Sequence, residues 1–360
     1  MTGISIDFLP VGSGSKSGDS ILIEYGSNYQ KQIMVVDGGS LAAGSAAVEH
    51  INTYFGAPAV IEHVVCTHQD GDHSSGLRKI IESFEVRNLW IHQPWLYAEQ
   101  LVSAFKYRWT AEGLSKHLRN DCFPIVASLC DLAEEYGVPL REPFQGTAIG
   151  PFYVLAPNIN RYLGLVPQMG QTPAARELAT ESVLAGIFKS IKDAVLSTVE
   201  GWGIETLGTP AAGATSVTNE TSVVLLGQFD SGRVLLTGDA GIGALQDAID
   251  GAAIYGLPLL SPDLVQVPHH GSRRNVSPGV LDAILGEKQS EYDLKRGSAI
   301  SSVSTGAEGF PRKVVENAFT RRGYACASTK DGWKNWTTGL TPRGGLSPVS
   351  PAPMHGLVED

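Results

Sequence analysis

Alternating apolar and polar side chains mark short strands near the N-terminus. The stretches "ISIDFLP" (4–10), "ILIEYG" (21–26) and "QIMVVDGGS" (32–40) follow this period or are rich in β-branched residues, which is typical of strands. A Gly/Ser-rich loop, "VGSGSKSGDS" (11–20), joins the first two stretches. Because the connections are short, the pattern predicts a β-meander whose third strand stops at Gly38.

Helical and strand patterns then alternate. "AVEHINTYF" (47–55) and "GLRKIIESF" (76–84) have apolar residues at helical spacing, and "VIEHVVC" (60–66), which lies between them, is predicted to be a buried strand. The pattern is helical over about 95–136 and returns to strand at "IGPFYVLAPN" (149–158).

The second half of the chain repeats this order. "TSVVLLGQF" (221–229) and "GRVLLTGDA" (232–240) are predicted strands joined by a tight turn. "DLVQVPHHGSRRN" (263–275) is a predicted strand that runs into a histidine-rich loop, and "PRKVVENAFTRRG" (311–323) is a predicted helix. Two such runs predict an α/β fold in which two sheets are sandwiched between helices.

One segment interrupts this repeat. "ARELATESVLAGIFKSIKDAVLSTVEGW" (175–202) has the spacing of an amphipathic helix, with Gly-, Pro-, Ala- and Thr-rich segments on both sides. We predict a helical insertion at about 160–212 within one domain of residues 1–340, followed by a partly mobile tail over 341–360. The insertion either packs on the core, or covers the site, or recruits a regulatory protein partner.

Composition excludes several classes of protein. The chain has 360 residues, of which 42% are hydrophobic and 18% charged, as in an ordinary globular enzyme. It has neither a basic, apolar N-terminal segment nor an apolar run of about 18 residues, so we expect no signal peptide and no membrane span. The scattered cysteines indicate free thiols and a cytoplasmic protein; they are Cys66, Cys122, Cys130 and Cys326.

The charge is uneven along the chain. The net charge of −10 argues against a protein that coats nucleic acid through a global positive field. From His269 to the end there are 12 Lys and Arg against 9 Asp and Glu, whereas the remainder has 15 against 28. A polyanion is therefore expected to approach the C-terminal third, although solvated surface charge is an equally simple explanation.

Three predicted strand ends carry side chains that can bind metal ions. The loop "CTHQDGDHSSG" (66–76) holds two histidines and two aspartates, "TGDA" supplies Asp239, and "PHHGS" supplies His269 and His270. Since the strand ends of a sheet lie together, these clusters can converge on metal ions. Helix capping and turns could explain one such loop, but they explain three in one chain poorly.

The order "DGG", "THQDGDHSSG", "LLTGDA" and "VPHHGS" resembles the metallo-β-lactamase fold superfamily. The ComEC/Rec2-type branch, known from the hydrolase domain of DNA-uptake competence proteins, is most similar. It shares "NETSVVL", a stretch like "DFLPVGSGSKSGDSILIEYG", and an aspartate, here Asp70, where other branches have histidine. The resemblance covers about 4–90, 140–158 and 217–335. It implies a metallo-β-lactamase αββα sandwich with a helical insertion.

The resemblance also implies a set of site residues. His68 and Asp70 would hold one metal ion, and Asp72, His73 and His270 would hold the other. Asp239 would bridge the two ions, and Asn219 stands where most of the superfamily has a further histidine ligand. Asp37, Asp19 with Ser20, and Ser222 are expected to orient ligands, although Asp37, Asp19 and Ser20 could equally be turn residues.

The predicted chemistry follows from two divalent ions. With Asp70 and Asn219 in place of histidines, the first site is rich in oxygen and favours Mn²⁺ or Mg²⁺, although affinity order alone favours Zn²⁺. A hydroxide shared by the ions would attack phosphorus or a carbonyl carbon. Asp72, Asp239 and His269 are the predicted catalytic residues, and His269 either protonates the leaving oxygen or is structural.

Basic residues near the histidine-rich loop favour an anionic substrate. Arg273 and Arg274 could grip flanking phosphates or simply be exposed to solvent. The helix that follows adds Arg312, Lys313, Arg321 and Arg322.

We therefore expect a metal-dependent hydrolase, and first of all a nuclease or phosphodiesterase that cleaves DNA. The alternatives are a hydrolase of a small ester, amide or thioester, and a binding module without turnover. The complete ligand set argues against the binding module. Competence, repair and antiviral defence are all compatible with the resemblance.

Overall fold

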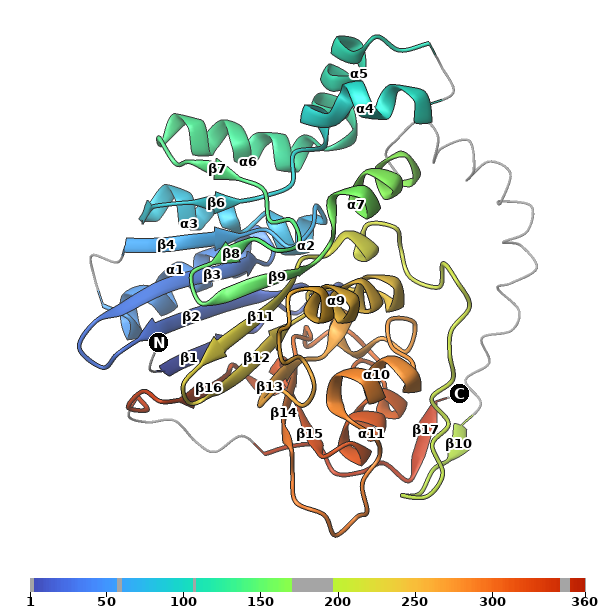
Figure 1. Ribbon diagram of the computed structural model, residues 1–360. Helices are drawn as coiled ribbons and strands as arrows, with labels where there is room; N and C mark the ends of the chain where they lie inside the picture. The colour runs from blue at the N-terminus through green and yellow to red at the C-terminus, as the bar shows by residue number, and fades with distance from the viewer. Residues whose placement is uncertain (1–2, 57–59, 106–107, 170–196, 344–349, 360) are drawn as a thin grey trace.

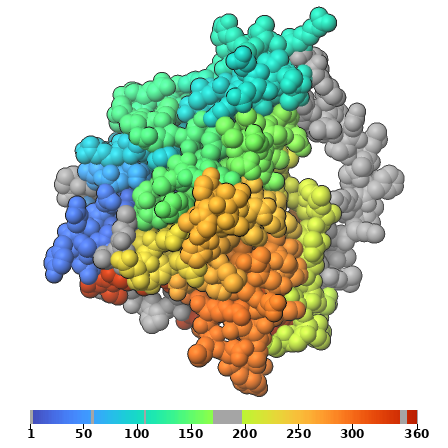
Figure 2. All heavy atoms as spheres, viewed as in Figure 1, coloured from blue at the N-terminus to red at the C-terminus, as the bar shows by residue number. Residues whose placement is uncertain are grey.

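Two β-sheets packed face to face form the centre of the molecule, and helices cover both outer faces (Figure 1). The computed structural model describes residues 3–56, 60–105, 108–169, 197–343 and 350–359. The first half of the chain, blue to green, packs directly against the second half, yellow to red (Figure 2). This arrangement confirms the predicted α/β sandwich of two sheets between helices.

The first sheet combines N-terminal strands with one strand from near the C-terminus. Its strands are β1 (Gly3–Phe8), β2 (Ser20–Gly26), β3 (Lys31–Gly38), β4 (Val60–Val65), β5 (Glu85–Val86), β6 (Leu89–Trp90), β7 (Leu140–Arg141) and β16 (Lys334–Thr338). Their order is β16-β1-β2-β3-β4-β6-β7, with β5 beside β4. Because β16 pairs antiparallel with β1, the C-terminal part of the chain completes the N-terminal sheet.

The second sheet contains the predicted strands of the second half. Its strands are β8 (Ala148–Ile149), β9 (Phe152–Ala156), β11 (Val224–Phe229), β12 (Gly232–Leu236), β13 (Leu264–Gln266), β14 (Gly297–Ser301) and β15 (Tyr324–Ser328). Their order is β15-β14-β13-β12-β11-β9-β8. The strands from β12 to β15 are parallel, so all of them end at the same edge.

Helices form the two outer layers and the connections. They are α1 (Leu41–Tyr54), α2 (Gly71–Ser74), α3 (Leu77–Ser83), α4 (Ala98–Leu101), α5 (Ala111–His117), α6 (Pro124–Glu135), α7 (Ile159–Leu165), α9 (Ile242–Ile254), α10 (Pro278–Leu285) and α11 (Lys313–Arg321). The region 95–136, predicted to be helical, consists of several short helices. Among the described residues, every helix is too short or too polar to cross a membrane.

The alternation of side chains decides what each strand buries. Ile4 and Ile6 of β1 point between the sheets, where they pack in one cluster with Leu225 of β11. Val35 of β3 points to the opposite face and packs in the cluster under α1 and α3. Burial on both faces explains why "IMVV" of β3 is continuously apolar.

The predicted insertion lies mostly outside the described residues. The long helix predicted over 175–202 falls largely on residues 170–196, which the structure does not describe. Its last residues are a strand rather than a helix: β10 (Ser197–Val199) pairs antiparallel with β17 (Leu357–Glu359). This pairing also gives the final residues of the predicted tail a partner, because Val358 lies opposite Thr198 and is buried.

Candidate metal centre

The candidate site lies where strands of both sheets end at one edge of the sandwich. β3 and β4 are parallel, with Val36 opposite Val65, so Asp37 and the loop 66–76 leave the first sheet together. β12 and β13 are also parallel, so Asp239 and "PHHGS" leave the second sheet together. The structure thus brings together the three clusters that the sequence singles out.

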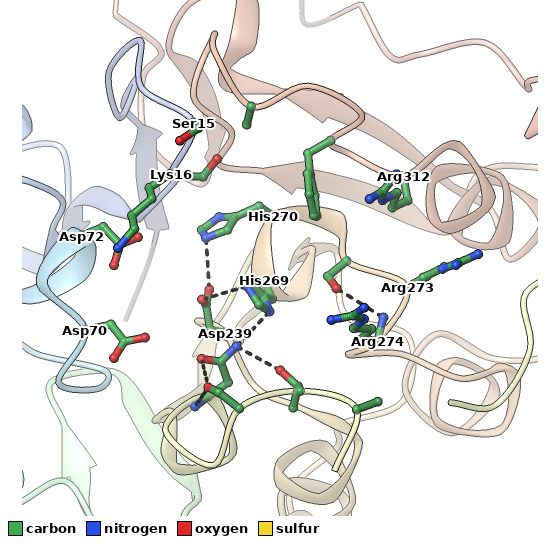
Figure 3. Close-up of a pocket in the computed structure, with 18 of the residues that line it drawn as sticks. Ser15, Lys16, Asp70, Asp72, Asp239, His269, His270, Arg273, Arg274 and Arg312 are labelled. Atoms are coloured by element: carbon green, nitrogen blue, oxygen red, sulfur yellow. Dashed lines mark hydrogen bonds and ion pairs between the residues drawn. The ribbon is translucent and has the colours of Figure 1, made fainter. Parts of the chain in front are cut away.

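Asp239 lies among four histidines, of which Figure 3 shows His269 and His270. The distances from its carboxylate oxygens to the Nε2 atoms are 4.0 Å for His68, 3.4 Å for His73, 3.6 Å for His269 and 3.5 Å for His270. A carboxylate surrounded in this way is positioned to bridge ions held by different imidazoles.

In two of these histidines, Nδ1, the ring nitrogen farther from Asp239, has a polar partner of its own. Nδ1 of His73 lies 2.8 Å from Oδ2 of Asp37, and Nδ1 of His270 donates to the carbonyl of Ser302 at 2.7 Å. Asp37 also accepts hydrogen bonds from the backbone and hydroxyl of Thr67, at 2.8 and 2.5 Å. A histidine that uses Nδ1 in this way presents Nε2 to a metal ion.

His68 is held more loosely. Its Nδ1 atom lies 3.0 Å from the hydroxyl of Thr67 and 3.4 Å from the hydroxyl of Ser222. Its Nε2 atom lies 3.8 Å from Oδ2 of Asp70. Ser222 and Asp70 therefore lie near the two different nitrogens of the same ring.

Three site residues have left-handed backbone conformations. The φ angles are 55° at Asp37, 45° at His269 and 59° at His270. Residues other than glycine rarely adopt this region, and strain of this kind concentrates at functional sites. The backbone turns sharply at these residues, which directs their side chains into the same space as Asp239.

Several buried atoms of the cluster have no hydrogen-bond partner in the described part of the chain. They are Nε2 of His68, Nε2 of His73 and Oδ1 of Asp239. The ligand atoms of His73, Asp239 and His270 lie within 4.8 Å of one another. Unpaired buried donors and acceptors are costly, so these residues fit metal ions that would satisfy them.

Burial and neighbouring charges shift the pKa values of the cluster in different directions. Burial alone would raise the pKa of Asp239, but the imidazoles of His270, His73 and His269 hold it well below its usual range, so Asp239 is ionised. Burial lowers the pKa of His68, which keeps this ring neutral and able to ligate. Burial would also lower the pKa of His73, but the carboxylates of Asp239 and Asp37 raise it well above its usual value.

A cavity of about 830 Å³ opens over the cluster. Asp239, His269 and His270 line it together with Asp70 and Asp72 (Figure 3). Asp70 and Asp72 flank the start of α2 and stand across the cavity from the second-sheet residues. A substrate in this cavity would therefore face ligand residues from both sheets.

Asn219 lines the same cavity and contacts His269. Its side-chain amide nitrogen is 2.9 Å from Nδ1 of His269 and donates to the hydroxyl of Thr215, while its amide oxygen accepts from Ser216. Both ends of the amide are therefore hydrogen-bonded, and its nitrogen contacts His269. Asn219 replaces a histidine ligand in the resemblance, but in the structure its contacts are those of an orienting residue.

Two buried amides that the sequence does not single out join the site to the rest of the fold. Oε1 of Gln266 accepts from the backbone of Thr237 and Gly238, and Nε2 donates to Asp19 at 2.8 Å. Burial raises the pKa of Asp19, which also lies 3.5 Å from Nδ1 of His73. The hydrogen bond between Gln266 and Asp19 links the two sheets directly behind the cluster.

Asn275 links the two second-sheet loops. Its amide nitrogen donates to the carbonyls of Asp239 and Ala240, at 2.9 and 3.2 Å, and its amide oxygen lies 3.0 Å from Nδ1 of His269. The residue is fully buried. The only sequence signal is its place in "PHHGSRRN", four residues after a glycine that ends the histidine pair.

The predicted basic residues separate into two groups. Arg273 and Arg274 are exposed and line the cavity, as does Arg312, whose guanidinium lies over the ring of Phe310 at 4.8 Å. Arg321 and Arg322 are instead buried in ion pairs with acidic residues, so they are not available to a substrate; the partners are Glu200, Glu205 and Asp282.

No protein-family model and no curated protein matches the sequence. Among solved structures, the metallo-β-lactamase fold protein YhfI from Bacillus subtilis has 14% identity and a TM-score of 0.40, over 92% of this chain and 99% of its own. A possible metal-dependent hydrolase from Veillonella parvula has 9% identity and a TM-score of 0.37, over 93% and 99%. MEM-A1, a subclass B3 metallo-β-lactamase from a soil metagenome library, has 12% identity and a TM-score of 0.29, over 78% and 85%.

The fold assignment depends on the architecture of this chain. Two sheets between helical layers, with histidines and aspartates gathered at the strand ends of both sheets, form the αββα sandwich of the metallo-β-lactamase fold. The similarity to the competence-protein branch stays a prediction.

Proposed function

We propose that the protein is a metal-dependent phosphodiesterase that cleaves nucleic acid, with DNA as the favoured substrate. The observation that carries this proposal is a single cavity that contains the Asp239 cluster together with three arginines, which are Arg273, Arg274 and Arg312. Arginine binds phosphate well because its planar guanidinium offers paired donors. A phosphodiester can thus be held by the arginines while its phosphorus lies over the cluster.

The chain supplies ligands for two divalent ions. His68, Asp70, His73, Asp239 and His270 would hold them, with Asp72 in reach on the same side as Asp70. When bound, these ions activate water and neutralise charge that develops on the phosphate. We favour Mn²⁺, or Mg²⁺, because Asp70 brings an oxygen where other branches have a nitrogen.

His269 is suited to a different role from the other three histidines. Its side chain is 31% exposed, against 0% for His68, 1% for His73 and 8% for His270. It lines the cavity, and Asn219 and Asn275 hold its Nδ1 atom. We assign to it the donation of a proton to the leaving oxygen.

A hydrolase of a small ester, amide or thioester is the second candidate. The cavity volume of about 830 Å³ supports it, because small-molecule sites have volumes of about 300–1,000 Å³. The three arginines favour an anionic substrate over a neutral one, and therefore favour the phosphodiesterase.

Purified protein incubated with plasmid, single-stranded DNA, RNA, bis-p-nitrophenyl phosphate, an acyl thioester and nitrocefin tests both candidates. Each substrate is offered with Mn²⁺, Mg²⁺ or Zn²⁺, and Asp239→Asn is the inactive control. We expect Mn²⁺-dependent cleavage of the phosphodiesters and none of nitrocefin or the thioester. Turnover of nitrocefin or the thioester without cleavage of any phosphodiester would contradict the proposal.

A further inference from the structure

We infer that Lys16 forms a second phosphate subsite, on the opposite side of the cavity from Arg273 and Arg274. The site would then take an internal phosphodiester of a nucleic-acid strand, with a phosphate on each side of the bond that is cut. This inference rests on the proposed function and deepens it, because it specifies an internal cut instead of trimming from an end.

The first observation is where Lys16 points. Lys16 lines the cavity from the loop between β1 and β2, and its side chain runs toward Asp72 on one side of it (Figure 3). Asp239 and His270 lie between it and the side of the cavity that carries Arg273 and Arg274 (Figure 3). The positive charges therefore stand on two sides of the ligand cluster. A strand that crosses the cluster would meet a cation before and after the reacting phosphate.

The second observation is that the loop is fixed on both sides of Lys16. Before it, the carbonyl of Gly12 accepts from the backbone of Thr305 at 3.1 Å. After it, the hydroxyl of Ser17 accepts from the backbone of Ser304 at 3.0 Å. The loop of the first sheet is thus tied to the segment that follows β14 of the second sheet, which limits where Lys16 can reach.

Gly18 fixes the same loop to the ligand residues. A Cβ atom at Gly18 would lie 1.7 Å from the carbonyl oxygen of Asp72, so the two backbones are in direct contact and only glycine fits. Lys16 is therefore held two residues away from a contact with the metal-binding loop.

The third observation is that these cations are unpaired. Within the described residues, Lys16, Arg273 and Arg274 form no ion pair, and all three line the cavity. Unpaired cations around a cavity attract a polyanion and bind its phosphates through charge-assisted hydrogen bonds.

A structural role for Lys16 makes a different prediction. Lys16 and Asp72 stand on the same side of the cavity (Figure 3), so Lys16 could simply lower the local negative charge near Asp72. In that case its loss would impair every substrate to the same degree. A phosphate subsite impairs long substrates more than a small diester, which has no neighbouring phosphate.

Lys16→Gln, with Lys295→Gln as the control, separates the two roles. Lys295 is an exposed lysine in the segment between α10 and β14, and it does not line the cavity. The substrates are bis-p-nitrophenyl phosphate and a doubly end-labelled DNA dodecamer, with Mn²⁺. We expect internal cuts by the wild type. We expect K16Q to lose about tenfold in kcat/KM on the dodecamer, to lose less on the small diester, and to show a salt dependence of binding weaker by about one ion.

Two further dodecamers carry one neutral methylphosphonate next to a chosen internal bond, either on its 5′ side or on its 3′ side. We expect one of them to lower wild-type cleavage at that bond by the same factor as K16Q, with no additional loss in K16Q itself. Either of two results would overturn the Lys16 subsite. In the first, K16Q loses the same factor in kcat/KM on the dodecamer and on the small diester. In the second, the loss caused by K16Q adds to the loss caused by each of the two methylphosphonates.

Two other outcomes distinguish this inference from the proposed function. If the wild type cleaves the dodecamer only from its ends, the inference is wrong and the proposed function stands. If the wild type turns over the small diester but cleaves no strand, the nucleic-acid function fails and the inference fails with it.

Discussion

The carboxylate of Asp37 lies 2.8 Å from Nδ1 of His73, and the opposite nitrogen of the same ring lies 3.4 Å from Asp239. One imidazole thus uses one nitrogen for orientation and the other for the candidate metal centre. Asp37 has a positive φ and also binds the backbone and hydroxyl of Thr67, so it connects the ends of β3 and β4. It can therefore tune a metal ion without touching it.

We expect Asp37→Ala to weaken binding of Mn²⁺ by about 10–100-fold, because residues that orient ligand histidines have effects of this size. Isothermal titration calorimetry on the metal-free protein measures it. Asp250→Ala, which removes an exposed carboxylate on α9, is the control and should bind as the wild type does. Equal affinities of Asp37→Ala and the control would show that Asp37 is only a turn residue.

Asp239→Ala and Asp72→Ala should abolish turnover of bis-p-nitrophenyl phosphate and leave the fold intact. Asp239 is the carboxylate that four imidazoles surround, and water cannot reproduce its charge or its geometry. Activity assays with Mn²⁺, together with circular dichroism spectra, test this expectation. A variant with a normal spectrum and near-normal activity would place the catalytic centre elsewhere.

The convergence of the ligand residues could be predicted because each cluster follows a strand with a clear local pattern. "VIEHVVC" and "GRVLLTG" are unmistakably strands, and strand ends of one sheet lie at one edge. Of the helix expected at 175–202, only the end lies among the described residues, and there the prediction was wrong, because residues 197–199 pair as β10 with a strand about 160 residues later along the chain. A local pattern cannot reveal such a distant partner.

The residues that support the ligands could not be predicted for the same reason. Gln266 and Asp19 are 247 positions apart, and a buried glutamine has no distinctive pattern in a sequence. Asn219 was placed among the ligands because of its position in a motif, whereas its amide is used by His269 and its near neighbours. Helix α9 was missed because alanines make up most of its buried face, which gives little contrast in hydrophobicity.

Arg321→Ala should destabilise the protein by about 3–5 kcal/mol without a specific loss of substrate binding, because it leaves a buried carboxylate without its partner. Arg321 and Glu200 are both fully buried and 2.9 Å apart, and the guanidinium also donates to the carbonyls of Gly201 and Ile204. Urea denaturation measures the change. Arg87→Ala, which breaks an exposed pair with Glu85, should cost less than about 1 kcal/mol.

If Arg321→Ala retained normal stability and lost affinity for DNA, the buried pair would not be structural. Arg321 would then belong with the basic residues of the cavity, as its place in "PRKVVENAFTRRG" first suggests.

His92 should make the metal-free protein less stable as the pH falls below about 6.5. Burial lowers the pKa of His92 to about 3, so the folded protein keeps this ring neutral while the unfolded chain takes up a proton at about 6.5. The unfolded state therefore binds more protons between these values, and stability falls with falling pH. One such histidine lowers the free energy of unfolding by about 2 kcal/mol between pH 7 and pH 5.

His92→Phe isolates this contribution, because His92 already stacks on Tyr162 and packs against Phe144 as an aromatic ring would. Urea denaturation at pH 7 and pH 5 in the presence of a chelator should show a smaller pH dependence in the variant, by about 2 kcal/mol. The same slope in both proteins would mean that His92 titrates normally in the folded state. His63, whose pKa burial lowers to about 4, should account for part of the slope that is left.

Gly76→Ala should disrupt the metal centre through backbone contact alone. A Cβ atom at Gly76 would lie 1.9 Å from the carbonyl oxygen of Gly38, and one at Gly44 would lie 2.3 Å from the carbonyl oxygen of Gly76. Gly76 has a φ of −70°, which alanine adopts easily. The substitution Gly76→Ala therefore destabilises through the steric clash and not through backbone strain. Gly38 follows Asp37 directly, and Gly76 lies three residues after His73, so a forced separation would pull the two side chains apart.

We expect Gly76→Ala to lower the free energy of unfolding by roughly 1–3 kcal/mol and to weaken Mn²⁺ binding at the same time. Gly279→Ala is the matched control. Gly279 lies in the first turn of α10 with no atom within 4 Å of an added Cβ, so the same substitution should raise stability by about 0.5–1 kcal/mol and leave Mn²⁺ affinity unchanged. Thermal unfolding and calorimetric titration of both variants measure the two effects. Loss of stability in Gly76→Ala with unchanged Mn²⁺ affinity would show that the contact supports the fold without positioning Asp37 against His73.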